Sequence, residues 1–295
     1  MVAVGEHGTP FLVGGFQCIA VSDGCHRYEN PLPLLLANAS FEQLEEALAG
    51  HGVEPGEWTE FVSPYTCLVV DTGRHVVLVD TGTGSGLDPD SGQLLDNLKV
   101  EGISPGDIDT VILTHGHPDH IGGAVDDRGR PVYPNARYVM THDEWEFWTT
   151  PKGETVLASL KIDEGIKGLL LDCARTNLLP LQGEIDLVDP EAEVVPGIRL
   201  IPASGHTPGQ VAPVVSSGNK HLIYISDAAV HPVHLERPQW HMAVDCAPQA
   251  ALATRRRLLK MAEGENTLVF GFHLPRVGLG RAIRRGEGWR WHPLL

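Results

Sequence analysis

Short apolar runs rich in β-branched residues recur along the chain, and each is five or six residues long. Runs of this length that end at polar residues or turns predict buried strands, because helices need longer periodic segments. The runs are CLVVD at 67–71, HVVLVD at 75–80, TVILT at 110–114, HLIYIS at 221–226 and TLVFGF at 267–272.

Stretches typical of helices lie between these runs. The predicted helices are residues 40–52, 143–148, about 154–178 and 248–264. Ser40 is a suitable cap for the first helix, while Pro248 in the first turn and Gly264 at the end delimit the last. Because strands and helices are interspersed, the predicted fold class is α/β. No linker-like tract or short repeat divides the sequence, so we expect one domain over residues 1–295.

The composition, with 42% hydrophobic and 20% charged residues, is that of a globular protein. No stretch approaches the roughly 18 consecutive apolar residues that a membrane helix needs. The N-terminus lacks the basic segment before an apolar one that marks a secretory signal. Five scattered cysteines without a C-x-x-C pair indicate reduced thiols. These features predict a cytoplasmic protein.

The formal net charge is 22 − 38 = −16. So acidic a surface repels phosphate backbones and anionic headgroups, which weighs against nucleic acid and membranes as partners. The basic clusters at 255–257 and 284–285 are expected to lie on solvated faces. A small molecule is the partner that we expect.

The densest group of metal-ligand residues follows the run TVILT, in the segment HGHPDH. Its members are His115, His117, Asp119 and His120. Imidazole and carboxylate groups are common ligands of zinc and similar cations. Gly116 and Pro118 disfavour a continuous helix, so the segment is predicted to be a loop that leads into a helix. The first two ligands can point to one side together, whereas the adjacent second pair cannot join them easily. The spacing therefore indicates two metal half-sites.

Three more residues of the same types each follow a later apolar run. They are His206 in RLIPASGHTPGQ, Asp227 in LIYISDAAV and His273 in TLVFGFHLP. A lone His after a strand is usually just a loop residue. Three such residues in addition to the HGHPDH segment form a set large enough for two metal ions.

These motifs resemble the metallo-β-lactamase superfamily of hydrolases. The matching elements occur in the family's order between residues 66 and 273. They are VLVDTG with Asp80, HGHPDH at 115–120, GHTPGQ at 205–210, SDA at 226–228 and FH at 272–273. The resemblance implies an αβ/βα four-layer sandwich, in which two β-sheets pack together, helices lie outside, and the metals lie at one edge.

The resemblance also implies how the ligands are shared between two divalent metal ions. One ion would be held by His115, His117 and His206. The other would be held by Asp119, His120 and His273, and Asp227 would bridge the two. The ions are expected to be zinc, with cobalt, manganese or iron as alternatives.

Two such ions allow hydrolysis by a metal-bridging hydroxide. Water bound to a metal ionises near pH 7 rather than near 16, and the ion pair polarises the substrate oxygen as well. Asp119 is the candidate catalytic residue, which accepts the proton of the nucleophile and passes it to the leaving group. Asp80 and Thr207 are expected to orient ligands and loop backbone. A turn-capping role for Asp80 is almost as well supported by the sequence and is compatible with the orienting role.

Regions outside the motifs resemble the branch that contains methyl-parathion hydrolases and N-acyl-homoserine-lactone lactonases. They are an N-terminal extension (about 1–60), a helical insertion (about 150–182) and a glycine-rich tail with Trp289 and Trp291. The extension could act as a lid or as the contact of a homodimer. We therefore expect cleavage of an ester, lactone or phosphotriester-type bond in a small molecule.

One position departs from this branch. Many of its lactonases have a Tyr three residues after the bridging Asp, where it contacts the lactone carbonyl, and here that residue is Val230. His231 or His234 could replace it, although a surface or structural role is the simpler expectation for both. Five aromatic residues could line an apolar pocket or belong to the core. They are Trp58, Trp145, Phe147, Trp148 and Trp240.

Other functions remain compatible with part of this pattern. A glyoxalase-II-like thioesterase would share all metal ligands, but it would need a basic helical C-terminal region instead of a short glycine-rich tail. A mononuclear iron oxygenase or a non-catalytic metal-binding protein would not need the complete second set of ligands.

Overall fold

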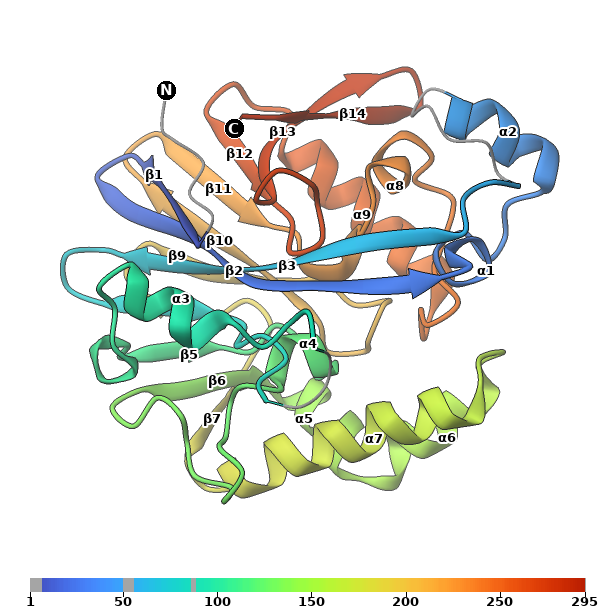
Figure 1. Ribbon diagram of the computed structural model, residues 1–295. Helices are drawn as coiled ribbons and strands as arrows, with labels where there is room; N and C mark the ends of the chain where they lie inside the picture. Colours follow the sequence, from blue (N-terminus) through green and yellow to red (C-terminus); the bar gives the residue numbers. More distant parts are fainter. Residues whose placement is uncertain (1–6, 50–55, 86–88, 295) are drawn as a thin grey trace.

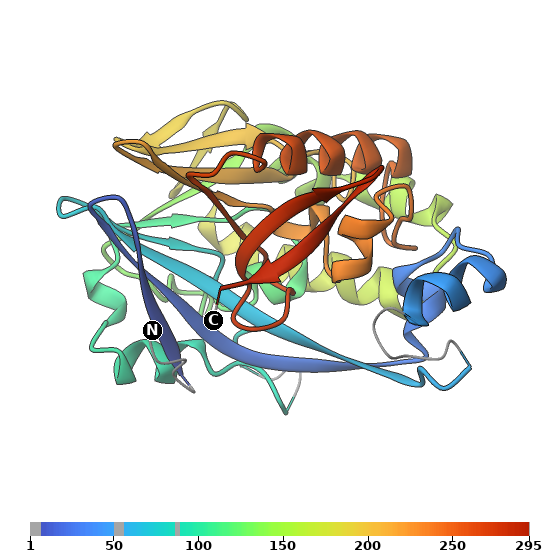
Figure 2. The same ribbon diagram turned by 90° about the horizontal axis from the view of Figure 1, so that it is seen from above.

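The computed structural model describes residues 7–49, 56–85 and 89–294. Within these ranges two seven-stranded sheets pack face to face, and helices lie on the outer side of each sheet (Figures 1 and 2). This arrangement confirms the predicted αβ/βα sandwich. In the same ranges, no helix combines the length and the apolar character that crossing a membrane requires.

The first sheet contains the strands in their order along the chain. They are β1 (Gly8–Val13), β2 (Phe16–Glu29), β3 (Glu60–Asp71), β4 (Val76–Val79), β5 (Thr110–Ile112), β6 (Arg137–Thr141) and β7 (Ile185–Val188). Strands β1 to β4 are antiparallel neighbours, and β4 to β7 are parallel. The helical elements that come before β8 are α1 (Pro31–Leu35), α2 (Phe41–Ala49), α3 (Leu94–Val100), η1 (Pro105–Asp107), α4 (Pro118–Ile121), α5 (His142–Thr149), α6 (Pro151–Ser159), α7 (Glu164–Leu178) and η2 (Leu179–Leu181).

The second sheet also follows chain order. Its strands are β8 (Glu193–Val195), β9 (Ile198–Pro202), β10 (Val211–Ser217), β11 (Lys220–Tyr224), β12 (Thr267–Phe270), β13 (Leu279–Arg285) and β14 (Gly288–Pro293). Neighbours are antiparallel except for the parallel pair β11 and β12. The helical elements between β11 and β12 are η3 (Ser226–Ala228), α8 (Pro232–Glu236) and α9 (Pro248–Met261).

The main hydrophobic core lies between the two sheets. It joins residues such as Leu68 and Leu78 of the first sheet to Leu222 and Phe270 of the second. A second cluster packs α9 against the outer face of the second sheet, where Leu258 is fully buried. Burial of these apolar side chains is the main contribution to the stability of the sandwich.

A third hydrophobic cluster joins α1 and α2 to α8, at the far ends of the long strands β2 and β3 (Figure 1). Residues 8–29, which we expected in an N-terminal extension, form β1 and β2 of the first sheet. The polar, glycine-containing sequence of β2 explains why the apolar pattern did not indicate it. Residues 1–6 and 50–55 of the expected extension lie outside the described residues.

The predicted helices and strands are present in the structure, but several of them begin or end at other residues than predicted. All five predicted strands are present. Ser40 caps α2 as expected: its backbone N–H donates to Gln43 Oε1 at 3.1 Å, and Gln43 N donates to Ser40 Oγ at 3.4 Å. The predicted end of this helix at Gly52 lies outside the described residues. The helix predicted at 154–178 is instead two helices, α6 and α7, because the chain turns between them at residues 160–163.

Arg255 corrects the expectation that residues 255–257 lie on a solvated face. Its side chain is fully buried, and its guanidinium donates to the backbone carbonyls of Ala228, Pro238 and Trp240. Buried carbonyl groups need hydrogen-bond donors, and Arg presents several in one plane. Arg255 therefore holds the connection that leads from η3 through α8.

Candidate metal centre

The predicted ligands lie where several strands of both sheets end. The segment HGHPDH follows β5, His206 follows β9, Asp227 follows β11, and His273 follows β12. Strands β9, β11 and β12 run in the same direction, so their carboxyl ends meet at one edge. The fold thus brings together side chains that are up to 158 residues apart, from His115 to His273.

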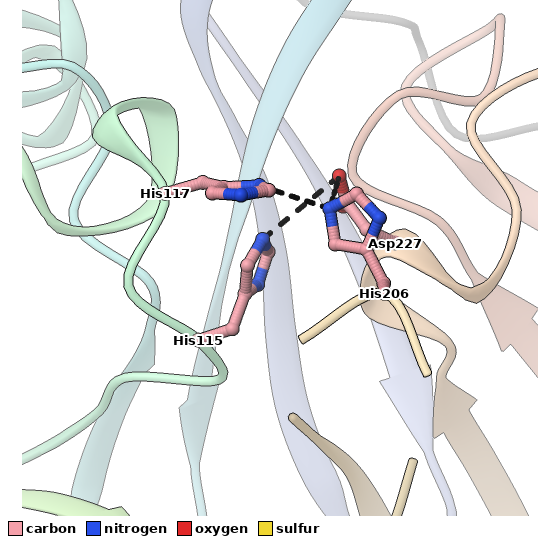
Figure 3. Close-up of side chains that lie close together, drawn as sticks. All are labelled: His115, His117, His206 and Asp227. Atoms are coloured by element: carbon pink, nitrogen blue, oxygen red, sulfur yellow. Dashed lines mark hydrogen bonds and ion pairs between the residues drawn. The ribbon is translucent and has the colours of Figure 1, made fainter. Parts of the chain in front are cut away.

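The HGHPDH segment forms the predicted loop and helix start. His117 is the N-terminal cap of the short helix α4, whose first residue is Pro118. Close packing requires a glycine at position 116, because a Cβ atom there would lie 2.4 Å from the indole of Trp148. The loop therefore fits closely over α5, and the ring of His117 packs edge-on against Trp148 at 5.5 Å between centroids. Figure 3 shows His115 and His117 directed toward His206 and Asp227.

One group of candidate ligands spans the two sheets. It consists of His115, His117, His206 and Asp227, and one ligand atom from each lies within 4.8 Å of the others. Figure 3 shows the two histidines of the loop facing His206 and Asp227 from the opposite side. The Nδ1 atom of His117 lies 2.9 Å from Nε2 of His206, and the latter lies 3.5 Å from Asp227 Oδ2. This spacing suits a single cation.

A second group lies beside the first. Its members are Asp119, His120 and His273, also within 4.8 Å of one another. The Nε2 atom of His273 lies 3.3 Å from Asp119 Oδ2 and 3.3 Å from Asp227 Oδ2. The Nε2 atom of His120 lies 3.1 Å from the other oxygen, Asp227 Oδ1. Asp227 therefore contacts both groups, as a bridging ligand must.

The donor atoms fit cations better than they fit one another. Among the described residues, the Nε2 atoms of His115 and His120 and the Oδ1 atom of Asp227 are buried without a hydrogen-bond partner, although the last two form an ion pair at 3.1 Å. Leaving a buried polar atom without a partner costs about 1–3 kcal/mol. Three such atoms in one place are explained by bound cations. The two groups of His and Asp side chains fit two divalent cations.

In three of these histidines, the ring nitrogen that faces away from the centre, Nδ1, has a polar partner. Nδ1 of His120 donates to Asp80 Oδ2 at 2.8 Å, and Nδ1 of His206 donates to Asp245 Oδ1 at 2.8 Å. Nδ1 of His273 lies 2.9 Å from Ser63 Oγ. A partner on Nδ1 fixes the ring and directs the lone pair of Nε2 toward the cation.

Asp80 acts as predicted, as an orienting residue. Besides His120, its carboxylate accepts hydrogen bonds from the backbone and hydroxyl of Thr114, at 2.8 and 2.9 Å, and from Tyr224 Oη at 2.8 Å. The backbone of Asp80 has a φ of 60°, and that of Ser226, next to Asp227, has a φ of 46°. Left-handed conformations of non-glycine residues are strained, and such strain is found mostly at functional sites.

Glu144 of α5 joins the two ligand loops. Its Oε1 accepts from Gly116 N at 2.9 Å and from Trp148 Nε1 at 2.6 Å. Its Oε2 accepts from Thr207 Oγ1 at 2.8 Å and from Gly209 N at 2.9 Å. Burial raises the pKa of Glu144, and these four hydrogen bonds oppose the rise. Thr207 thus orients the loop that contains His206, as expected.

The two groups differ in their protonation. Burial, together with the neighbouring histidines, lowers the pKa of His115 well below its usual value and that of His117 to about 3. These rings are neutral near pH 7, which is the form that binds a cation. Burial opposes the charge of His273 as well, but Asp227 and Asp119 raise its pKa to about 9. Despite burial, the charges of His120 and His273 hold the pKa of Asp119 at about 2. The carboxylates of Asp119 and Asp227 thus favour positive charge at the second group, whether a proton or a cation supplies it.

Sequence reasoning missed the partners that lie far away in the chain. Asp245 follows its histidine by 39 residues, and Ser63 precedes His273 by 210. Neither belongs to a motif, and Glu144 lies in a helix with an ordinary composition. Only the fold places them at the site, so no local pattern could have indicated them.

The two histidines near Val230 differ in their surroundings. His234 is fully buried, and its Nε2 donates to the backbone carbonyl of Leu35 at 2.8 Å, which is a structural role. His231 caps α8, and its ring packs against Trp58 and Phe61. Val230 itself is buried in the cluster of α1, α2 and α8. Of the five candidate pocket aromatics, three are core residues: Phe147, Trp148 and Trp240.

An αβ/βα sandwich with a paired His/Asp centre at its edge defines a class of metal-dependent hydrolases. Residues 61–273 match the family model described as the metallo-beta-lactamase superfamily. The chain belongs to this superfamily, and its fold and centre place it among the metal-dependent hydrolases there.

Curated relatives and solved structures agree with this assignment. An N-acyl homoserine lactonase of Bacillus thuringiensis is 22% identical over 250 residues, which cover 78% of this chain and 88% of the relative. The structure of AidC, a dizinc quorum-quenching lactonase in complex with a product, is similar with a TM-score of 0.85 and 27% identity, covering 98% of both chains. The hydrolase AbOPH has the same fold, with a TM-score of 0.86, 24% identity and 98% of both chains covered.

Proposed function

We propose that the protein is a dinuclear metal-dependent hydrolase that cleaves a lactone, an ester or a phosphotriester-type bond in a small molecule, with a lactone as the first candidate. The observation on which this depends is the contact of Asp227 with both groups of candidate ligands. The similarity to AidC, a dizinc lactonase, over 98% of both chains supports the choice of a lactone.

The residues have distinct roles in this proposal. His115, His117 and His206 would hold one cation, and Asp119, His120 and His273 would hold another. Asp227 contacts both groups and would be shared between them. Two divalent cations, when bound, would supply a water of lowered pKa and polarise the bond that is attacked. Asp119 would accept the proton of the nucleophile and pass it to the leaving group, because its carboxylate lies among the candidate ligands, 3.3 Å from His273 Nε2.

Zinc is the metal that we propose. The two groups together offer five imidazoles and two carboxylates, and zinc binds both kinds of ligand readily. Cobalt, manganese and iron accept similar ligands, so metal analysis of the purified protein is needed to identify the ion.

The proposed function is tested by a hydrolysis panel on protein saturated with zinc. The panel contains acyl-homoserine lactones of two chain lengths, an aryl ester, a paraoxon-type phosphotriester and a glutathione thioester. We expect the highest kcat/KM for a lactone and loss of all activity after dialysis against a chelator. Activity on the thioester alone would contradict the proposal and identify a glyoxalase-II-like enzyme.

Two further proposals concern the setting of the enzyme. We propose a cytoplasmic location, since thiols such as Cys18, Cys67 and Cys246 are free and burial raises the pKa of each. We also propose a homodimer through the N-terminal segment, in which Leu12 is 65% exposed and Phe41 is 60% exposed. Light scattering measures the mass directly, and a monomer would exclude this dimer.

A further inference from the structure

Strands β2 and β3 extend past the metal centre and direct a row of side chains toward it. Along β3 the side chains of Phe61, Ser63 and Tyr65 alternate with outward ones and share one face. Ser63 contacts His273 through its hydroxyl, so this face is the one turned toward the centre. On the neighbouring strand, Tyr28 pairs with Phe61 and lies on the same face.

Tyr65 is the residue of this row that lies against the candidate ligands. Its ring is edge-on to His273 at 5.3 Å between centroids, and it packs on Phe272 at 5.5 Å. The side chain is buried to about the same extent as the ligands themselves, with 4% exposure for both Tyr65 and His273.

The hydroxyl of Tyr65 lies 3.2 Å from the hydroxyl of Tyr28. A pair of phenols has two O–H protons, and their mutual hydrogen bond uses only one. When Tyr28 donates, the proton of Tyr65 is left for another acceptor. The other buried tyrosine near the centre differs, because Tyr224 donates its proton to Asp80.

An aromatic surface continues from this pair. The ring of Tyr28 stacks on Phe61 at 6.3 Å, and Phe61 meets Trp58 edge-on at 6.0 Å. His231, which lies four residues after Asp227, closes the row against both Trp58 and Phe61. A substrate at the two groups of ligands would thus have an aromatic surface beside its apolar part and a phenol beside its reacting end.

We propose that Tyr65, oriented by Tyr28, contacts the substrate and donates a hydrogen bond from its hydroxyl to the carbonyl or phosphoryl oxygen of the bond that is cleaved. The inference rests on the proposed hydrolase function. The oxygen gains negative charge in the transition state, so a neutral donor aimed at it contributes more there than in the bound substrate. No proton is transferred from Tyr65, and Tyr28 acts only through Tyr65 as a positioning residue.

The test compares Tyr65→Phe with Tyr28→Phe and with the control Tyr133→Phe. The hydroxyl of Tyr133 is also buried, but it lies in the main hydrophobic core and has no hydrogen-bond partner among the described residues. With the best substrate of the panel, we expect kcat of Tyr65→Phe to fall about 10- to 100-fold with KM changed less than threefold. Tyr28→Phe should lower kcat less, about two- to fivefold, and Tyr133→Phe should leave kcat unchanged.

Metal affinity separates substrate contact from a structural role. We expect Tyr65→Phe to retain two zinc ions per chain and the wild-type affinity in competition with a chelator. Loss of a zinc ion would overturn the proposal, since Tyr65 would then support His273 rather than the substrate. A kcat within twofold of the wild type would overturn it as well. If the wild type itself hydrolyses no member of the panel, the proposed function fails instead.

Discussion

The histidines of the centre owe their geometry to residues that do not face the cations. Asp245 is a clear case, because its Oδ1 accepts from His206 Nδ1 at 2.8 Å while its Oδ2 accepts from Met242 N at 3.0 Å. Both oxygens are thus acceptors in fixed positions. An amide in their place has only one acceptor, and its NH2 group would face a donor.

Asp245→Asn is therefore expected to weaken metal binding. Loss of an orienting partner reduces metal affinity by about 10- to 100-fold. Competition with a chromophoric chelator measures the affinity. The control is Asp186→Asn, which removes an exposed carboxylate paired with Arg137 at 3.1 Å and should change nothing. Equal affinities of the two variants would refute the role of Asp245.

In the proposed function, Asp119 has a chemical role besides its role as a ligand. Asp119→Asn removes the proton acceptor while keeping a side-chain oxygen near His273. We expect kcat to fall at least about 100-fold, measured on protein whose two zinc ions have been verified by metal analysis. A variant with both ions and the wild-type rate would show that another group accepts the proton.

At the scale of the elements, α5 holds the two ligand loops together through one buried carboxylate. Glu144 accepts four hydrogen bonds, two of them from the backbone N–H groups of Gly116 and Gly209. Glu144→Ala would leave these donors buried and unpaired, and we expect a loss of about 2–5 kcal/mol in the free energy of unfolding. Urea denaturation measures the change.

The matched control for this prediction is on the same helix. Glu146 is exposed and pairs with Lys152 at 2.6 Å, so Glu146→Gln should cost less than about 1 kcal/mol. If both variants were equally stable, the hydrogen bonds of Glu144 would not contribute to the free energy of unfolding.

The contact between α8 and α1 predicts a dependence of stability on pH. Burial, assisted by the charge of Arg255, lowers the pKa of His234 to about 3. The folded protein keeps this ring neutral while the unfolded chain binds a proton below its ordinary pKa near 6.5, so stability falls as the pH falls from 6.5 toward 3. His234→Gln keeps a donor for the Leu35 carbonyl but cannot titrate.

The variant should therefore lose less stability than the wild type on acidification. Between pH 6 and pH 4, we expect the wild type to lose up to about 1.4 kcal/mol more per pH unit than His234→Gln. Urea denaturation at several pH values gives both slopes. Parallel slopes would mean that His234 does not stay neutral in the folded protein.

For the whole molecule, the features that could be predicted from the sequence are those determined by residues close together in the chain. The seven candidate ligands follow apolar runs, and a short run of β-branched residues indicates both the presence of a strand and where the strand ends. The start of α4 could be predicted in the same way, since proline is common in the first turn of a helix and Pro118 is the first residue of α4. These features depend on neighbours in the chain, so a single sequence contains them.

Features that depend on distant contacts could not be predicted. Arg255 is part of a basic cluster in sequence, yet the connection from 228 to 240 folds around it and buries it. Strand β2 is polar along its outer half, because that half lies beyond the core and carries Tyr28 toward Tyr65. In both cases tertiary packing decides the environment of the residue.

The central claim is that two cations act together in one centre. It is tested by adding zinc to metal-free protein in steps and measuring the rate of lactone hydrolysis against the number of ions bound per chain. We predict that the rate reaches its plateau at about two ions per chain, because Asp227 contacts both groups of ligands. A full rate at one ion per chain, or no hydrolysis at two, would contradict the account.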